Sequence, residues 1–172
     1  MQGSSGNVAT VNFFTKFTSS EQFEKVFREG MSLVEETANY LDGPGRLDAR
    51  VLERHGAIAY ATESMRLTTR LMQLASWLLL QRAIGAGELT VEDARKETHR
   101  ISLNDIGKGH DLAGANDLPD ALKALVERSL TLHQRIQKLD SMISAQTSTA
   151  QTPSPVNDQI DRLASMLKVA RG

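Results

Sequence analysis

The chain has 172 residues, and its 20 basic and 21 acidic side chains leave a formal net charge of -1. That length suits one domain with appendages, and so small a net charge excludes the strong single-sign field that draws proteins to nucleic acid or acidic membranes. Because the chain has no cysteine, disulfides, thiolate zinc sites and cysteine nucleophiles are excluded, and we expect a protein of the reducing cytoplasm.

The N-terminal segment is expected to pack against the rest of the protein. Residues 1–10 lack the basic and then apolar regions of a secretion signal. All five phenylalanines lie between Phe13 and Phe27, and such side chains need to be covered. We therefore predict a leader over residues 1–18 that folds onto a helical domain.

A first long helix is predicted after this leader. Ser19 or Ser20 is the expected N-cap, and the run Gly43-Pro44-Gly45 ends the helix. Residues 43–56 then form a linker. The apolar residues of this helix recur at helical spacing: Phe23, Phe27, Met31, Val34, Ala38 and Leu41.

The segment 57–84 predicts a central helix with two apolar seams about 100° apart, which indicates two neighbouring helices. One seam contains Ile58, Ala61, Met65, Thr68, Met72, Ala75 and Leu79. The other contains Tyr60, Ser64, Leu67, Leu71, Leu74 and Leu78. A third face, with Glu63, Arg66, Arg70 and Gln73, is expected to meet water until Trp77 and Leu80 interrupt it. The apolar run 78–80 is far shorter than the roughly 20 residues of a membrane span, so no span is expected.

An excursion over residues 85–116 separates the central helix from the next long one. Thr90 and Asp93 predict the start of a short accessory helix that ends near Ile101, and turn-forming residues follow it. The third long helix is expected over residues 118–143, with Pro119 in its first turn and Asp117 as its cap. Its apolar stripe contains Leu118, Leu122, Leu125, Ser129, Leu132, Ile136, Leu139 and Ile143.

The C-terminal segment differs in composition. Residues 145–155 are rich in Ser, Thr and Gln and contain two prolines, which predicts a disordered linker. Residues 157–169 then return to helical spacing, as a short amphipathic segment within a flexible tail over 145–172. The predicted fold class is all-α: a three-helix bundle of long antiparallel helices over residues 19–144, with a short accessory helix and a disordered C-terminal tail.

No catalytic or metal-binding motif is found in the sequence. The four histidines lack the His-Glu-x-x-His spacing and the Glu-x-x-His pairs of a di-iron bundle. Gly107-Lys108-Gly109 lacks the remaining residues of a phosphate loop. His99, Asp105, His110 and Asp111 could converge on a metal, but solvated loop polarity is the preferred interpretation. We therefore expect no enzyme, no cofactor and no metal.

Apolar residues in unusual places are better candidates for function. Trp77 and Leu80 either lie under the accessory helix or form a partner face, for which a homodimer is the hypothesis. The tail is either inert or a partner-binding motif on a tether, and the second reading is the hypothesis. The residues of that motif are Ile160, Leu163, Met166, Leu167, Lys168 and Val169.

Several stretches are distinctive when taken together. They are Phe27–Ala38 followed by Tyr40–Gly43, Tyr60–Met72 continuing through Ser76–Leu79, and Leu132–Ile136 with Leu139-Asp140. These stretches resemble the regulator of CtrA degradation family of alphaproteobacteria. The resemblance covers about residues 11–143, and the central helix is its most specific part.

The resemblance implies a dimeric three-helix bundle with a flexible C-terminal tail, acting as an adaptor or scaffold in regulated proteolysis without catalysis. In that family the adaptor joins the ClpXP protease through a complex with the response regulator CpdR, and it promotes turnover of CtrA or other cell-cycle factors. The expected partners are therefore proteins: ClpX or ClpXP, a CpdR-like response regulator, substrate transcription factors and a second copy of the chain. The alternative is a scaffold in signalling that is not linked to proteolysis.

Overall fold

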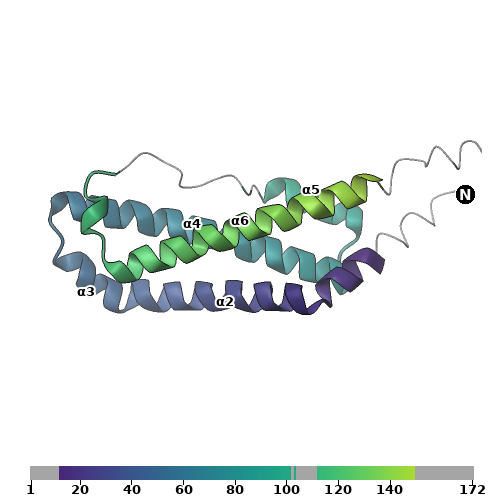
Figure 1. The fold of residues 1–172 in the computed structure, drawn as a ribbon, viewed down its shortest axis with the longest axis horizontal. Coiled ribbons are helices and arrows are strands. Elements are labelled where there is room, and N and C mark those ends of the chain that lie inside the picture. The colour runs from purple at the N-terminus through teal and green to yellow at the C-terminus, as the bar shows by residue number, and fades with distance from the viewer. Residues whose placement is uncertain (1–11, 102, 104–111, 150–172) are drawn as a thin grey trace, which may run out of the picture.

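Long helices make up most of the structure, a computed structural model that describes residues 12–101, 103 and 112–149 (Figure 1). A helical segment over residues 12–18 precedes α2 (Glu21–Asp42), α3 (Pro44–Arg50), α4 (Arg54–Gly85), α5 (Val91–Arg100), the 3-10 helix η1 (Ala115–Asp117) and α6 (Asp120–Thr149). The described residues contain no strand, and the predicted all-α helical bundle is confirmed. Its long helices are α2, α4 and α6, and α5 is the accessory helix.

α2 is antiparallel to both of its long neighbours. A short connection that contains α3 turns the chain from α2 into α4. Against α6, Glu29 of α2 pairs with Arg135, while Glu36, further along α2, pairs with the earlier Arg128; both N–O distances are 2.7 Å. These ion pairs are half-exposed, so each contributes at most about 1 kcal/mol. They indicate that α2 and α6 are antiparallel, and they add little to the stability of the bundle.

α4 and α6 instead run parallel (Figure 1). Arg70 of α4 bonds Ser129 of α6, and further along both helices Trp77 bonds Asp140. The expectation of antiparallel neighbours is therefore corrected for this pair. The physical reason is the excursion after Gly85, which carries the chain back to the end of the bundle where α4 begins before α6 starts.

Local sequence signals set two of the helix starts as predicted. The Ser20 hydroxyl accepts a hydrogen bond from the backbone N–H of Phe23 at 3.2 Å and caps α2. The Thr90 hydroxyl does the same for the N–H of Asp93 at 3.1 Å and caps α5. Each bond satisfies a backbone donor that has no partner within its own helix.

Other boundaries differ from the sequence prediction. α3 lies within the expected linker and has no counterpart among the predicted elements; Pro44 begins it, because the fixed φ of proline suits a first helical turn. Asp117 belongs to η1, and α6 begins at Asp120. α6 also continues to Thr149, past the predicted end at residue 143.

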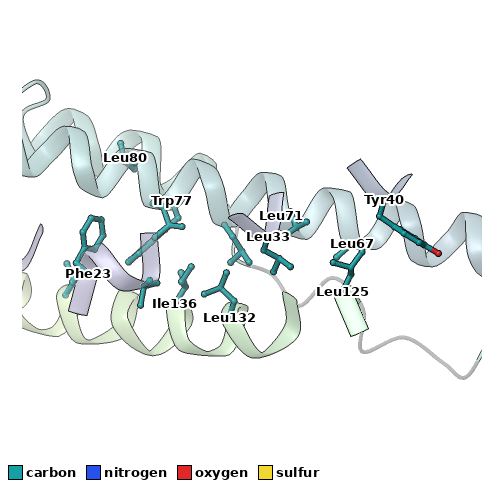
Figure 2. Close-up of a cluster of buried hydrophobic side chains, with 14 of the residues drawn as sticks. Phe23, Leu33, Tyr40, Leu67, Leu71, Trp77, Leu80, Leu125, Leu132 and Ile136 are labelled. Atoms are coloured by element: carbon teal, nitrogen blue, oxygen red, sulfur yellow. The ribbon is translucent and has the colours of Figure 1, made fainter. Parts of the chain in front are cut away.

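The core lies between α2, α4 and α6 (Figure 2). The seam of α4 that contains Leu67, Leu71, Leu74 and Leu78 is buried, as predicted. Burying one such side chain fully stabilises a protein by about 1.5–3 kcal/mol. The largest fully buried apolar side chains are Trp77, Phe23, Leu33, Leu67, Leu74, Leu78, Leu122, Leu132 and Ile136.

Aromatic rings connect the segment 12–18 to the core. Phe13 stacks on Phe17, Phe17 contacts Phe23, and Phe23 contacts Phe27, with ring centroids 6.2, 5.3 and 6.1 Å apart. Phe14, on the other side of the segment, is buried. Such pairs stabilise by about 0.5–1.5 kcal/mol beyond their burial. The division of the chain at residues 18 and 144 stays a prediction.

Tyr40 holds the corner between α2 and α3. Its hydroxyl donates to Asp48 Oδ2 at 2.8 Å. Burial, followed by the nearby Asp48 carboxylate, raises the pKa of Tyr40 above its ordinary value, so the hydroxyl keeps its proton and stays a donor.

Two glycines with positive φ allow a matched test of how η1 packs against α4. Gly114 has φ 86°, and a Cβ there would lie 2.5 Å from the backbone carbon of His55. Gly87 has φ 74°, but a Cβ there would have nothing within 4 Å. Both positions therefore share the strain of a left-handed backbone, and close backbone packing is present at Gly114 alone of the two.

We expect Gly87→Ala to lower the free energy of unfolding by about 1–2 kcal/mol, the cost of the left-handed conformation. Gly114→Ala should cost a further 1–3 kcal/mol or so, because the new methyl group forces the His55 backbone away. Urea unfolding followed by circular dichroism measures both values. Equal losses at the two positions would contradict the close approach of η1 to α4.

Candidate functional site

Trp77 and Leu80, the two side chains predicted to form a partner face, are buried within the chain. Trp77 is 0% exposed and Leu80 7% exposed. The Trp77 indole donates from Nε1 to Asp140 Oδ1 of α6 at 2.8 Å. Beside this contact, Gln137 of α6 donates to the carbonyl of Leu103, which follows α5, at 3.0 Å. Of the two alternatives, burial within the chain is the one that the structure shows, and the hypothesis of a partner face at Trp77 and Leu80 is wrong: α6 and the excursion with its accessory helix cover this side of α4.

The other predicted site residues fall outside the described residues. They are Ile160, Leu163, Met166, Leu167, Lys168 and Val169 of the tail, and Asp105, His110 and Asp111 of the candidate metal cluster. Within residues 12–101, 103 and 112–149, no three His, Cys, Asp or Glu side chains gather closely enough to hold a metal ion. No helix in that part of the chain is long and apolar enough to cross a membrane.

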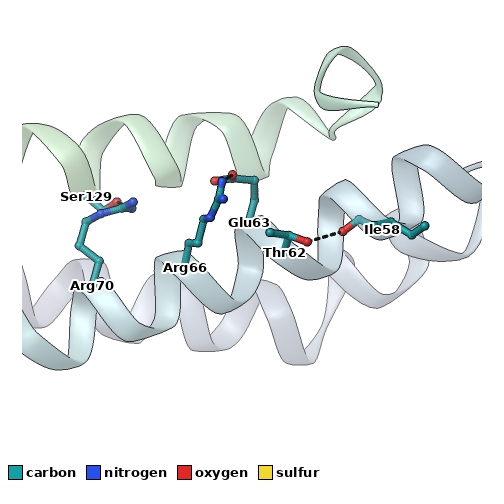
Figure 3. A network of polar contacts seen from close by, with 6 residues as sticks. All are labelled: Ile58, Thr62, Glu63, Arg66, Arg70 and Ser129. Atoms are coloured by element: carbon teal, nitrogen blue, oxygen red, sulfur yellow. Dashed lines mark hydrogen bonds and ion pairs between the residues drawn. The ribbon is translucent and has the colours of Figure 1, made fainter. Parts of the chain in front are cut away.

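The charged face of α4, which was expected to meet water, turns toward α6 (Figure 3). Arg70 is 1% exposed, and its Nη1 donates to Ser129 Oγ at 2.7 Å. Glu63 and Arg66 form an ion pair at 2.8 Å on the same side and are largely covered. The expectation that this face meets water is wrong, because the apolar stripe of α6 contains the fully buried Ser129, which accepts the guanidinium hydrogen bond.

The outward face of α4 has the opposite character and is apolar. Ile58, Met65, Met72 and Leu79 are 55%, 71%, 65% and 53% exposed. We call these four residues the outer stripe; they lie seven residues apart and so fall on one line along the helix. They belong to a seam that the sequence predicted to be buried. That prediction is wrong within a single chain, because α2 and α6 occupy the other faces of α4.

Small residues lie between the large residues of the outer stripe. The threonine hydroxyls here are bonded within the helix. Thr62 donates to the Ile58 carbonyl at 2.9 Å (Figure 3). Thr68 and Thr69 donate to the carbonyls of Ser64 and Met65 at 2.8 and 2.9 Å. If another surface displaces water from this face, these hydroxyl donors keep their acceptors. The face is ready for burial against another surface.

Charge is absent from this face over its whole length. The charged residues between Ile58 and Leu79 are Glu63, Arg66 and Arg70, and all three lie on the side that faces α6. A surface helix normally places its charged residues toward water and its apolar residues inward. α4 departs from this order over about six turns, since its outward face is apolar in addition to its buried leucine seam. Contiguous exposed apolar surface of this kind is typical of interaction sites.

Comparison with known proteins shows the family to which the chain belongs. A family model described as a protein of unknown function (DUF1465) matches residues 14–167. The crystal structure of RcdA from Caulobacter crescentus CB15 is 47% identical to the chain with a TM-score of 0.59, and the match covers 75% of this chain and 96% of that one. The chain belongs to the RcdA family. The resemblance to the regulator of CtrA degradation family is thereby confirmed. No curated protein matches the chain.

In this member of the RcdA family, the sequence does carry a signal for the outer stripe. Large apolar residues recur at seven-residue intervals from Ile58 to Leu79, with small residues between them. That spacing is typical of a helix that pairs with another straight helix along its length. The sequence does not say which helix that is.

Arg70 and Ser129 provide a test of the polar contact that sets the orientation of α4. Ser129→Ala should lower the free energy of unfolding by about 1.5–3 kcal/mol, because a buried charge loses an acceptor. In an Arg70→Met background the same change should cost far less, since no buried charge remains. Urea unfolding of the four proteins gives the coupling free energy. A Ser129→Ala loss that is equal in both backgrounds would refute this account.

Proposed function

We propose that the chain is a non-enzymatic cytoplasmic adaptor of regulated proteolysis that acts as a homodimer. The observation that carries the proposal is the 47% identity to RcdA over 96% of that chain. As the family resemblance implies, the adaptor joins ClpXP together with a CpdR-like response regulator. It promotes the degradation of CtrA or other cell-cycle transcription factors.

The surface of α4 supports a role in protein binding. An adaptor needs surfaces that bind other proteins, and the outer stripe is exposed, apolar and free of charge. Contiguous apolar surface is costly to leave in water and is uncommon on monomers unless a partner uses it. The stripe is therefore the described feature that best fits such a role.

The tail supplies a second contact in this proposal. The amphipathic segment at residues 157–169 binds a partner with its apolar residues, and the segment from the end of α6 at Thr149 tethers it to the bundle. A short tether holds a motif at high effective concentration near a partner that is already bound. Which partner receives the tail is an outcome of the test below.

The proposal is tested by reconstituting degradation from purified ClpX, ClpP, a CpdR-like regulator and CtrA of the parent organism. We expect the chain to shorten the half-life of CtrA or of another cell-cycle factor supplied in its place. A pull-down with the full chain identifies partners in parallel. Unchanged half-lives, together with capture of a signalling complex that lacks these proteins, would favour the scaffold unlinked to proteolysis.

Leu163→Asp should abolish delivery in this assay, because it places a charge on the apolar side of the amphipathic segment. Ser165→Asp adds the same charge on the opposite side of the predicted helix and should leave delivery unchanged. Both variants should unfold at the same temperature as the unmodified protein. Full delivery by Leu163→Asp, or by a chain that lacks residues 157–172, would remove the tail from the mechanism.

A further inference from the structure

The short helix α3 exposes arginine and large apolar side chains together. The exposed residues of α3 and its C-cap are Pro44, Arg46, Leu47, Arg50 and Val51. Leu47 is 64% exposed and Val51 84% exposed. Arg46 and Arg50 are four residues apart, as are Leu47 and Val51, so each pair lies side by side along the helix. We call these four residues the α3 face.

Contacts on its inner side hold α3 in place at the end of the bundle where α2 leads into α4 (Figure 1). The Tyr40 hydroxyl donates to Asp48 at 2.8 Å. Gly45 is buried, and a Cβ there would lie 2.6 Å from the Tyr60 hydroxyl oxygen. A helix of seven residues is not stable alone in water, so these contacts fix its position. A partner therefore meets a preorganised α3 face and loses little affinity to ordering it.

The charges of this corner favour an acidic partner. Arg46, Arg50 and Arg54 are all exposed. Of the two acidic residues in the same stretch, Asp48 turns inward to Tyr40, and Glu53 is the exposed one. α4 begins at Arg54 without an acidic residue in its first turn, and the N-terminus of a helix carries a partial positive charge.

The arginines of α3 are available to a partner. Arg50 has no ion pair among the described residues. Arg46 pairs with Asp42 at 3.0 Å, but the two side chains are 67% and 80% exposed. So exposed an ion pair contributes little stability, and the carboxylate of a partner can compete for Arg46.

We propose that the α3 face binds a protein segment in which apolar residues alternate with Asp and Glu. The apolar residues of the segment cover Leu47 and Val51, and its carboxylates pair with Arg46 and Arg50. Arginine suits this role because its planar guanidinium can bind a carboxylate through two parallel hydrogen bonds. The inference rests on the proposed adaptor function, and it assigns a surface and a chemistry to one of the protein partners.

Other occupants fit the α3 face less well. Residues 157–172 of the tail contain two acidic and three basic side chains, so the tail lacks the required negative charge. An anionic membrane would attract the arginines, but membrane binding grows with the apolar area that is buried. α3 is only about 10 Å long at 1.5 Å per residue, and its face has two large apolar side chains.

The first test measures the concentration of full-length chain that gives half-maximal acceleration of CtrA degradation in the reconstituted system. Arg50→Glu should raise it by about 10-fold or more, because like charges then meet in the complex. Arg50→Lys should raise it far less. Arg28→Glu, the same charge change at an exposed arginine of α2, is the matched control and should leave it unchanged.

The apolar part of the face has its own matched pair. Leu47→Ser should raise the same concentration, and Met142→Ser, at an exposed methionine of α6, should not. Circular dichroism and light scattering should show the helix content and mass of the unmodified chain for every variant. Equal effects of Arg50→Glu and Arg28→Glu, or a changed mass for Arg50→Glu, would overturn the proposal.

The second test identifies the partner segment by its sequence. The photo-crosslinking residue benzoylphenylalanine replaces Val51 in the full chain, which is mixed with the purified proteins and, separately, with lysate of the parent organism. Mass spectrometry should find crosslinks to a segment rich in Asp and Glu with apolar residues between them. The same group in place of Thr131, exposed on α6, should not capture that segment.

Several results would overturn the inference: crosslinks from position 51 to the tail, to a second copy or to a segment without acidic residues. Binding to phosphatidylglycerol vesicles that Arg50→Glu abolishes would overturn it in favour of a membrane. A chain that delivers no substrate would overturn the adaptor role instead, and the crosslinked segments from lysate would still decide what the α3 face binds.

Discussion

The buried guanidinium of Arg70 is the constraint on which the arrangement of α4 depends. Arginine keeps its charge under all ordinary conditions, so burying it requires hydrogen-bond acceptors inside the protein. Ser129 of α6 provides one at 2.7 Å, which fixes the face that α4 turns toward α6. A helix rotates about its axis as one unit, so the direction of one side chain fixes the directions of the others. Once Arg70 points inward, Met65 and Met72 must point outward, and the exposed stripe follows from the buried charge.

The parallel packing of α4 and α6 explains why the outward face remains open. A chain that placed its third long helix directly after α4 would fold it back antiparallel. Here the excursion returns the chain to the start of α4, where Gly114 lies against the backbone of His55. α6 then packs along the side of α4 that includes Arg70 and Trp77, while α2 covers the leucine seam. Within residues 12–101, 103 and 112–149, no long helix remains for the third side of α4.

Sequence patterns predict the helices of this protein better than the orientation of α4. Periodicity and the caps at Ser20 and Thr90 identify long helices, because these signals are local and act within one turn. They miss α3, since a stretch with glycines around Pro44 resembles a turn. They also assign the faces of α4 incorrectly: Met65 and Met72 look like core, and Arg70 looks like a solvated side chain. The rule behind both assignments is that apolar side chains of a helix face the core of their own chain and charged side chains face water. It fails for a helix whose apolar face is left for a second surface.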